Sequence, residues 1–200
     1  MPLATPPVGR RERNKQVKLE RITAAARELF TEHGVDDVTT QQIAEKADIG
    51  TGTLFLYAKT KGEQLLLVQN SGNADALEQG KAVAESTPDT LDAVMAIIGP
   101  VVECNRVQID NGRTYLRELV FGDPDEPHHR EAIALTIQTE EAIAAVLRRD
   151  DRIGPRDAST LAHVVSAIMY LSMTSPANVA LTVDDILQET RDQVRVLLPH

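Results

Sequence analysis

The sequence predicts an all-helical protein, and three observations support this. Apolar residues recur every three or four positions over nearly the whole chain, while no segment alternates apolar and polar residues long enough to indicate a strand. Residues that commonly start or end helices lie between these apolar segments. The composition, 42% hydrophobic and 26% charged over 200 residues, is typical of a folded globular chain. We expect an N-terminal three-helix unit followed by a C-terminal helical bundle.

The first predicted helix runs roughly from residue 14 to residue 33. Its apolar residues lie on one face, so this face should pack against the rest of the unit. Gly34 follows as the left-handed residue that ends many helices. The stripe consists of Ile22, Ala25, Ala26, Leu29 and Phe30.

Two short helices are expected next. Thr39 and Gln42 have the spacing of a capping box, which predicts that the second helix starts there. Residues 48–50 break this helix, and another begins at Thr51. Two short helices joined by so tight a turn are typical of a helix-turn-helix, which is a DNA-reading motif.

Charge is distributed unevenly along the chain. Residues 1–64 hold ten basic and nine acidic side chains, whereas residues 65–200 hold eleven and twenty-one. We expect residues 1–13 to be a basic flexible arm that attracts phosphate, with a merely solubilising tail as the alternative. The arm residues in question are Arg10, Arg11 and Arg13.

Three stretches resemble the DNA-binding domain of the tetracycline-repressor (TetR-like) family: TTQQIA at 39–44, ADIGTGTLFLY at 47–57 and KGEQL at 61–65. The resemblance covers about residues 15–66. It implies an all-helical homodimer, usually a repressor relieved by a ligand. Residues 14–60 would be the helix-turn-helix DNA-binding domain, and residues 61–200 would bind the ligand and dimerise.

The resemblance also implies which residues meet DNA. Leu56 stands where the family commonly has tyrosine, so we expect it to contact a thymine methyl group, with burial against the first helix as the alternative. Ala58 replaces a common phenylalanine, which predicts that Phe30, Leu54 and Phe55 fill more of the core. The implied groove-reading residues are Thr51, Gly52 and Thr53, and the implied phosphate contacts are Thr40, Tyr57 and Lys61.

Aromatic residues are scarce in the C-terminal two thirds, so a ligand pocket there should be lined by aliphatic and methionine side chains. Ordinary core packing is the alternative for each apolar candidate, and a solvated face for the arginines. A Gly99-Pro100 pair is expected to kink or break its helix, and residues 122–127 should form a loop. The candidates are Met95, Ile98, Val102 and Cys104, with Asn105, Arg113, Arg117 or Gln138 as polar anchors.

The two C-terminal helices predict assembly. Their apolar residues exceed what one chain of this size should cover, so a four-helix bundle with a symmetry mate is expected, and a purely intrachain core is the alternative. The candidate interface residues are Leu161, Val165, Ile168, Met169, Ile186 and Val194.

Other classes of protein are disfavoured. His128 and His129 are adjacent and lack the i, i+4 spacing of a helix-borne zinc site, and no catalytic motif is present, so we expect no enzyme, no metal and no cofactor. His163 is expected to be packed or at an interface. The single Cys104, the charged N-terminus and the polar interruptions in residues 158–183 indicate a cytoplasmic protein without a signal peptide or membrane span.

The sequence therefore predicts a ligand-responsive transcriptional repressor. Its partners would be double-stranded palindromic DNA, a second copy of itself and an unknown small-molecule inducer. One alternative is the same regulator without an inducer. Another is a helical interaction module or enzyme that has lost DNA binding.

Overall fold

A computed structural model describes residues 9–199, and every regular element in that range is a helix. The all-helical prediction is confirmed. The helices are α1 (Arg10–His33), α2 (Thr40–Lys46), α3 (Thr51–Leu54), α4 (Lys61–Glu85), α5 (Thr90–Arg106), α6 (Ile109–Phe121), α7 (Pro127–Leu147), α8 (Pro155–Thr174), the short 3-10 helix η1 (Pro176–Asn178) and α9 (Val183–Leu197).

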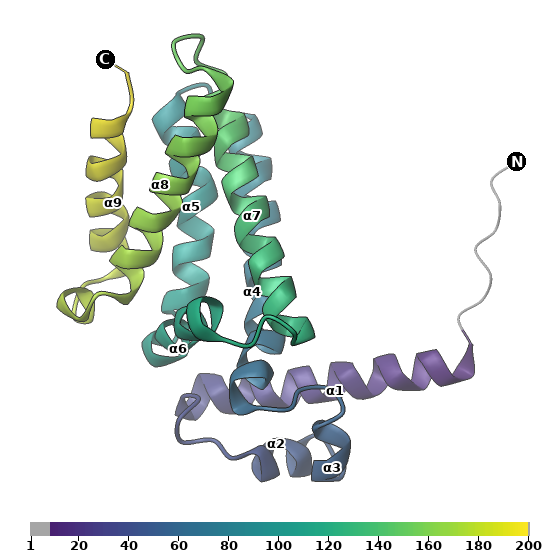
Figure 1. The fold of residues 1–200 in the computed structure, drawn as a ribbon. Coiled ribbons are helices and arrows are strands. Elements are labelled where there is room, and N and C mark those ends of the chain that lie inside the picture. The colour runs from purple at the N-terminus through teal and green to yellow at the C-terminus, as the bar shows by residue number, and fades with distance from the viewer. Residues whose placement is uncertain (1–8, 200) are drawn as a thin grey trace, which may run out of the picture.

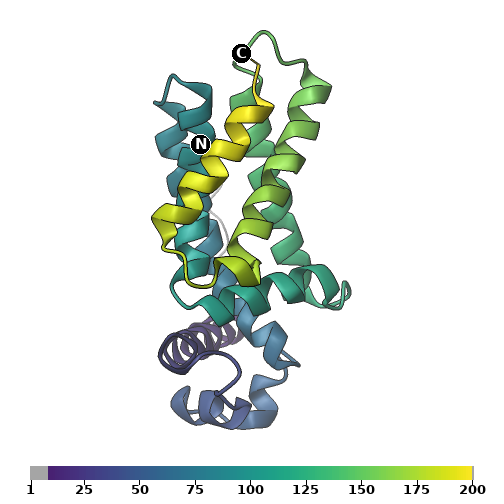
Figure 2. The ribbon, with the colours of Figure 1, turned by 90° about the vertical axis from the view of Figure 1, so that its left-hand side faces the viewer.

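Helices α1, α2 and α3 form a small N-terminal domain at one end of the molecule (Figures 1 and 2). Its core is apolar and closed, because the largest side chains that face inward from the three helices are at most 1% exposed. This matches the predicted apolar stripe of the first helix. These side chains are Ile22, Phe30, Ile43 and Leu54.

Helix α1 begins at Arg10, four residues before the expected start at Asn14. Arg10, Arg11 and Arg13 are therefore helical, which corrects that part of the expected flexible arm. Gly9 is the N-cap, and no glycine or proline follows it within the helix, whereas the arginine, glutamate, lysine and glutamine residues there favour helix. Residues 1–8 of the expected arm lie outside the described residues.

Phe55 does not fill the N-terminal core as expected. Helix α3 ends at Leu54, and the side chain of Phe55 is 45% exposed. Leu54 and Ala58 are buried, so Leu54 fills the core as expected and Phe55 does not.

The C-terminal body, residues 61–199, is a bundle of long helices that stands on the N-terminal domain (Figure 1). Helix α4 starts next to the N-terminal domain and runs the length of the body, packing mainly against α5 and α7. Helix α6 is short and lies across the junction between the two parts (Figure 1). Helix α9 covers α5 and α8.

Helix α5 continues through Gly99 and Pro100 to Arg106, so the proline does not break it. Close packing supports this helix. A Cβ atom on Gly80 of α4 would lie 2.8 Å from the backbone of both Ala96 and Ile97, which shows that only glycine lets these two helices approach so closely. The predicted loop is present between Phe121 and Pro127. Across residues 9–199, no helix combines the length and apolar character that crossing a bilayer requires.

Candidate nucleic-acid interface and ligand groove

The start of α2 has the predicted capping box. The Thr39 hydroxyl accepts a hydrogen bond from the Gln42 backbone N–H at 3.2 Å, and the Gln42 side-chain oxygen accepts one from the Thr39 N–H at 2.7 Å. Two backbone N–H groups that a helix start leaves unpaired are thereby satisfied. Thr40, the first helical residue, is half-buried beside this cap.

The turn between α2 and α3 is held by a contact with α1. Asp48 adopts the left-handed conformation, with φ at 51°, which aspartate tolerates better than most residues. Arg21 donates hydrogen bonds to its carbonyl oxygen at 3.0 Å and its carboxylate at 2.8 Å. These two bonds join α1 to the turn and hold Asp48 in this conformation.

The segment from α3 to Tyr57 presents side chains outward. Leu56 is 84% exposed, so the alternative that it is buried against the first helix is wrong. Gly52 is exposed, and Thr51 and Thr53 are half-buried. An exposed apolar tip beside small polar residues can contact base edges in a major groove.

A basic groove separates this segment from the N-terminal half of α1. It has a volume of about 990 Å³. Its walls carry four cationic side chains and one carboxylate, so its charge suits a phosphate backbone. The structure thus brings residues of the expected arm next to the expected reading residues. The basic groove is lined by Arg10, Arg11, Glu12, Asn14, Lys15, Lys18, Thr53, Leu56 and Tyr57.

Two expected phosphate contacts already have partners within the chain. The Tyr57 hydroxyl donates to the Lys15 carbonyl at 3.3 Å. The Lys61 ammonium donates to the carbonyl oxygens of Asp36 at 2.9 Å and Val38 at 3.0 Å. Both side chains therefore stabilise the N-terminal domain, and Lys61 retains one of its three N–H donors for another acceptor.

Asn111 of α6 joins the N-terminal domain to the body. Its side-chain oxygen accepts a hydrogen bond from the Val35 N–H, and its amide donates to the Phe30 carbonyl, both at 2.7 Å. The side chain is 6% exposed. Because it bonds the end of α1 and the residue that follows Gly34, a displacement of α6 must disturb the end of α1.

A second set of contacts between the N-terminal domain and the body lies where α7 begins. Lys59 pairs with Glu126 at 2.6 Å, and His128 Nε2 lies 3.0 Å from the Tyr57 carbonyl oxygen. The His128 N–H donates to the Glu63 carboxylate at 3.3 Å, and burial raises the pKa of Glu63. The segment after α3 is thus tied to both α4 and α7.

The two adjacent histidines point to different partners. His129 Nε2 lies 3.2 Å from the Leu119 carbonyl oxygen, whereas His128 contacts Tyr57. Among residues 9–199, no three histidine, cysteine or acidic residues are grouped so that they could hold a metal ion. His163 is not packed within its own chain, because its side chain is 75% exposed and its Nδ1 lies 2.9 Å from Glu140, which leaves the interface alternative.

The six expected ligand-binding residues do not line a common pocket. Ile98 and Val102 are fully buried in the core, Met95 and Cys104 are half-buried, and Gln138 is exposed. Asn105 is 3% exposed and donates to Asn73 at 2.7 Å. It lines a cavity of about 10 Å³, close to the space that one water molecule needs.

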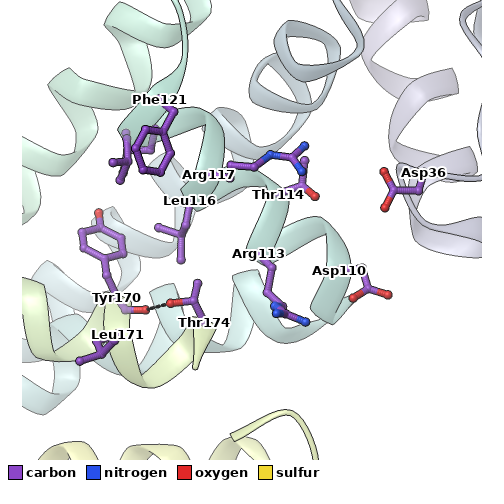
Figure 3. Close-up of a pocket in the computed structure, with 12 residues that line it drawn as sticks. Asp36, Asp110, Arg113, Thr114, Leu116, Arg117, Phe121, Tyr170, Leu171 and Thr174 are labelled. Atoms are coloured by element: carbon purple, nitrogen blue, oxygen red, sulfur yellow. Dashed lines mark hydrogen bonds between the residues drawn. The ribbon is translucent and has the colours of Figure 1, made fainter. Parts of the chain in front are cut away.

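A larger groove lies between α6 and the C-terminal half of α8 (Figure 3). Its volume is about 640 Å³, within the usual range of small-molecule sites. Of the residues that line this groove, only Arg113 and Arg117 were predicted from the sequence, as polar anchors for a ligand. The spacing of Arg113, Arg117 and Phe121 at i, i+4 and i+8 could have revealed it, because it places two cations and a ring on one helix face. The α6/α8 groove is lined by Asp36, Asp110, Arg113, Thr114, Leu116, Arg117, Leu119, Val120, Phe121, Tyr170, Leu171 and Thr174.

Four of the expected interface residues are covered by their own chain. Val165, Met169, Ile186 and Val194 are all 0% exposed, because α8 and α9 pack on each other and on α5. A single chain thus covers more of these apolar faces than expected, and these four side chains are not accessible to a partner.

A different set of α8 residues remains uncovered. Leu161 and Ile168 are half-buried, and Val164 and Leu171 are 37% and 70% exposed. Their spacing, i, i+3, i+7 and i+10, places them along one side of α8. We call this set the α8 stripe.

The sequence model of the family described as "Bacterial regulatory proteins, tetR family" matches residues 22–67, from the middle of α1 into α4. A comparison with curated proteins found no match.

Solved structures with the same fold include FadR of Thermus thermophilus, a TetR-family transcriptional repressor in complex with lauroyl-CoA. It is 19% identical, with 91% of this chain and 95% of that chain covered at a TM-score of 0.71. A TetR regulator from Rhodococcus sp. RHA1 is 16% identical, with coverage of 92% and 97% and a TM-score of 0.71. The TetR-family regulator PfmR, also from Thermus thermophilus, is 19% identical, with coverage of 90% and 100% and a TM-score of 0.63. At these identities the likeness shows the fold alone.

Proposed function

Since residues 22–67 match the tetR family of bacterial regulatory proteins, we propose that the chain is a transcriptional regulator of this family and not an enzyme, and that it is a repressor released by a small molecule. It would bind palindromic operator DNA in the cytoplasm as a homodimer. The basic groove is the observation that carries this proposal, because it combines an exposed reading segment with cations that suit phosphate.

The geometry supports distinct roles on DNA. The first turn of α3, with Thr51, Gly52 and Thr53, would enter the major groove, and the exposed Leu56 would contact a thymine methyl group. The cations of α1 would meet the phosphates on one side of that groove. Lys61 would act mainly through the carbonyls it holds, with one donor left for a phosphate.

The α8 stripe supports dimerisation. TetR-family regulators usually dimerise. The part of the α8 stripe outside the α6/α8 groove, Leu161, Val164 and Ile168, can pack against its symmetry mate in a two-fold interface, whereas Leu171 lines the groove. Such a dimer would place two α3 segments about 34–36 Å apart, the spacing of successive major grooves, so the operator should be palindromic.

The contacts that Asn111 and His128 make between the N-terminal domain and the body offer a way for a ligand to release the protein from DNA. Asn111 and His128 tie the N-terminal domain to α6 and α7, so a change in the body that moves either helix would change the distance between the two α3 segments. A ligand shifts this equilibrium only through its difference in affinity for the two forms. A complete switch needs about 5.5 kcal/mol.

DNA binding should be measured by fluorescence anisotropy with duplexes from the region upstream of the protein's own gene. Lys15→Ala should weaken binding to all duplexes and reduce the salt slope by about 1, because it removes one phosphate contact. Leu56→Ser should instead change the preference among duplexes that differ by single base pairs. Arg148→Ala, on the exposed end of α7, is the matched control and should change neither.

The outcomes separate the candidate functions. Failure to bind any duplex at low salt would refute the repressor and favour a helical module without DNA binding. Equal effects of Lys15→Ala and Leu56→Ser on every duplex would show that the reading segment is wrongly assigned. DNA binding that no metabolite weakens would favour a regulator without an inducer.

A further inference from the structure

We propose that the α6/α8 groove is the binding site for a small amphipathic anion, with a carboxylate or phosphate head held by Arg113 and Arg117 and an apolar body laid on Phe121 and Leu171. This inference rests on the proposed function in one respect: the anion acts as the inducer only if the chain is a repressor released by a small molecule. The site itself is argued from the groove.

The apolar end of the groove is unusually exposed. Phe121 is 82% exposed, Leu171 is 70% exposed and Val120 is 67% exposed. Three large apolar side chains gathered at one groove keep a substantial area in water, and such patches mark binding sites. Covering Phe121 and Leu171 with an apolar ligand would remove that area from water.

The cations lie next to this apolar end. Arg113 is half-buried and forms no hydrogen bond or ion pair with any residue of the range 9–199. Within the described part of the chain, Arg117 forms one ion pair, with the Glu118 carboxylate at 3.6 Å. The fork of N–H donors on a guanidinium matches a carboxylate or phosphate. The free donors of Arg113 therefore favour an anion.

The order of the lining residues selects the head group. Figure 3 shows Phe121, Tyr170 and Leu171 toward one end, Asp36 and Asp110 at the other, and the arginines between them. An anionic head can meet the arginines while its body lies on the apolar end. A cationic head would have to pass both arginines to reach the carboxylates, with its apolar body left beside charged groups.

Helix α6 links this site to the N-terminal domain at two points. Asn111 bonds the end of α1, and a Cβ atom on Gly62 would lie 2.5 Å from the Glu118 carboxylate carbon, so Glu118 packs directly on the first turn of α4. A ligand that draws on Arg113 and Arg117 acts on the same helix, between these two contacts. The groove is thus placed to alter the position of the DNA-reading segment.

The test uses three probes with one apolar chain and different heads: octanoate, 1-octanol and octyltrimethylammonium. Calorimetric titration of the full, DNA-free chain should show octanoate binding at one site per chain, at least about tenfold tighter than octanol, which corresponds to about 1.4 kcal/mol. Octyltrimethylammonium should bind more weakly than either.

Variants locate the site. The double variant Arg113→Gln, Arg117→Gln should reduce octanoate affinity to that of octanol and leave octanol unchanged. Phe121→Ser should weaken both, and because this ring is exposed the variant should fold normally. The double variant Arg148→Gln, Arg156→Gln, which removes two exposed arginines elsewhere, is the matched control and should change nothing.

Equal affinity for the three probes, or octanoate binding that survives loss of both groove arginines, would overturn the proposal. So would a change in the sedimentation mass of Phe121→Ser in place of a change in probe binding, because the groove would then be an interface between two copies of the chain. Since these titrations contain no DNA, a protein that binds octanoate as expected but ignores every duplex would refute the repressor and retain the site.

Discussion

Replacing Asn111 with alanine tests the joint between the two parts of the molecule. The change removes two hydrogen bonds of 2.7 Å between α6 and the end of α1. The two backbone groups that lose a bond differ in whether another hydrogen-bond partner remains. The Phe30 carbonyl keeps a bond from the Gly34 N–H at 3.0 Å, whereas the Val35 N–H, in a residue only 2% exposed, loses the partner that it has in the structure.

The expected cost follows from these contacts. An unsatisfied buried donor costs about 1–3 kcal/mol, and the second lost bond about 0.5–1.5 kcal/mol. The higher helix propensity of alanine returns less than about 0.7 kcal/mol. We therefore expect a net loss of about 2 kcal/mol, which lowers the Tm of a chain this size by about 4–8 °C.

Thermal unfolding followed by circular dichroism should show this shift, with Gln138→Ala as the control because that amide is exposed on α7. The same variant should loosen the coupling between the body and DNA binding. An unchanged Tm, or an equal shift in the control, would refute the reasoning that these two bonds hold the N-terminal domain against α6.

Three further predictions concern packing, ionisation and capping. Gly80→Ala should lower the free energy of unfolding by about 1–3 kcal/mol, because its Cβ would meet the backbone of α5 at 2.8 Å. Gly99→Ala, with open space around its Cβ, should raise the free energy of unfolding by about 0.5–1 kcal/mol. Equal effects of the two variants in denaturant titrations would contradict this. Burial raises the pKa of Tyr115 and Tyr170 above the ordinary 10.0, so these two phenols should ionise late in an absorbance titration of the folded protein. Because the unfolded chain loses these protons first, stability should fall as the pH rises above 10.0. Ordinary ionisation of Tyr115 and Tyr170 in the folded protein would refute their burial. Thr39→Ala should cost about 1 kcal/mol in thermal unfolding, because it removes the cap of α2, and no loss would show that this cap is dispensable.

Much of the N-terminal domain could be predicted because its signals are local. The capping box at Thr39, the helix start at Thr51 and the stripe around Ile22 each depend on a few neighbouring residues, and the structure has all three. The start of α1 was placed too late because the prediction treated a run of arginines as an arm, although nothing in that run stops a helix.

The body shows the limit of local reasoning. Helical periodicity identifies an apolar face, but it does not say what covers that face. Val165 and Ile186 have the same pattern that an interface would have, yet they are covered by helices of their own chain. Leu171 was absent from the expected interface although it is the most exposed large apolar residue of α8.

The amino-acid sequence by itself determined the all-helical fold and, in the N-terminal domain, the helices with their boundaries to within a few residues, because periodicity, caps and short turns are encoded in adjacent residues. Only the tertiary structure decided which apolar faces stay uncovered, that Asn111 bridges two domains, and that arginines of α6 meet a groove completed by α8. These features join residues tens of positions apart, and their contacts depend on how whole helices pack.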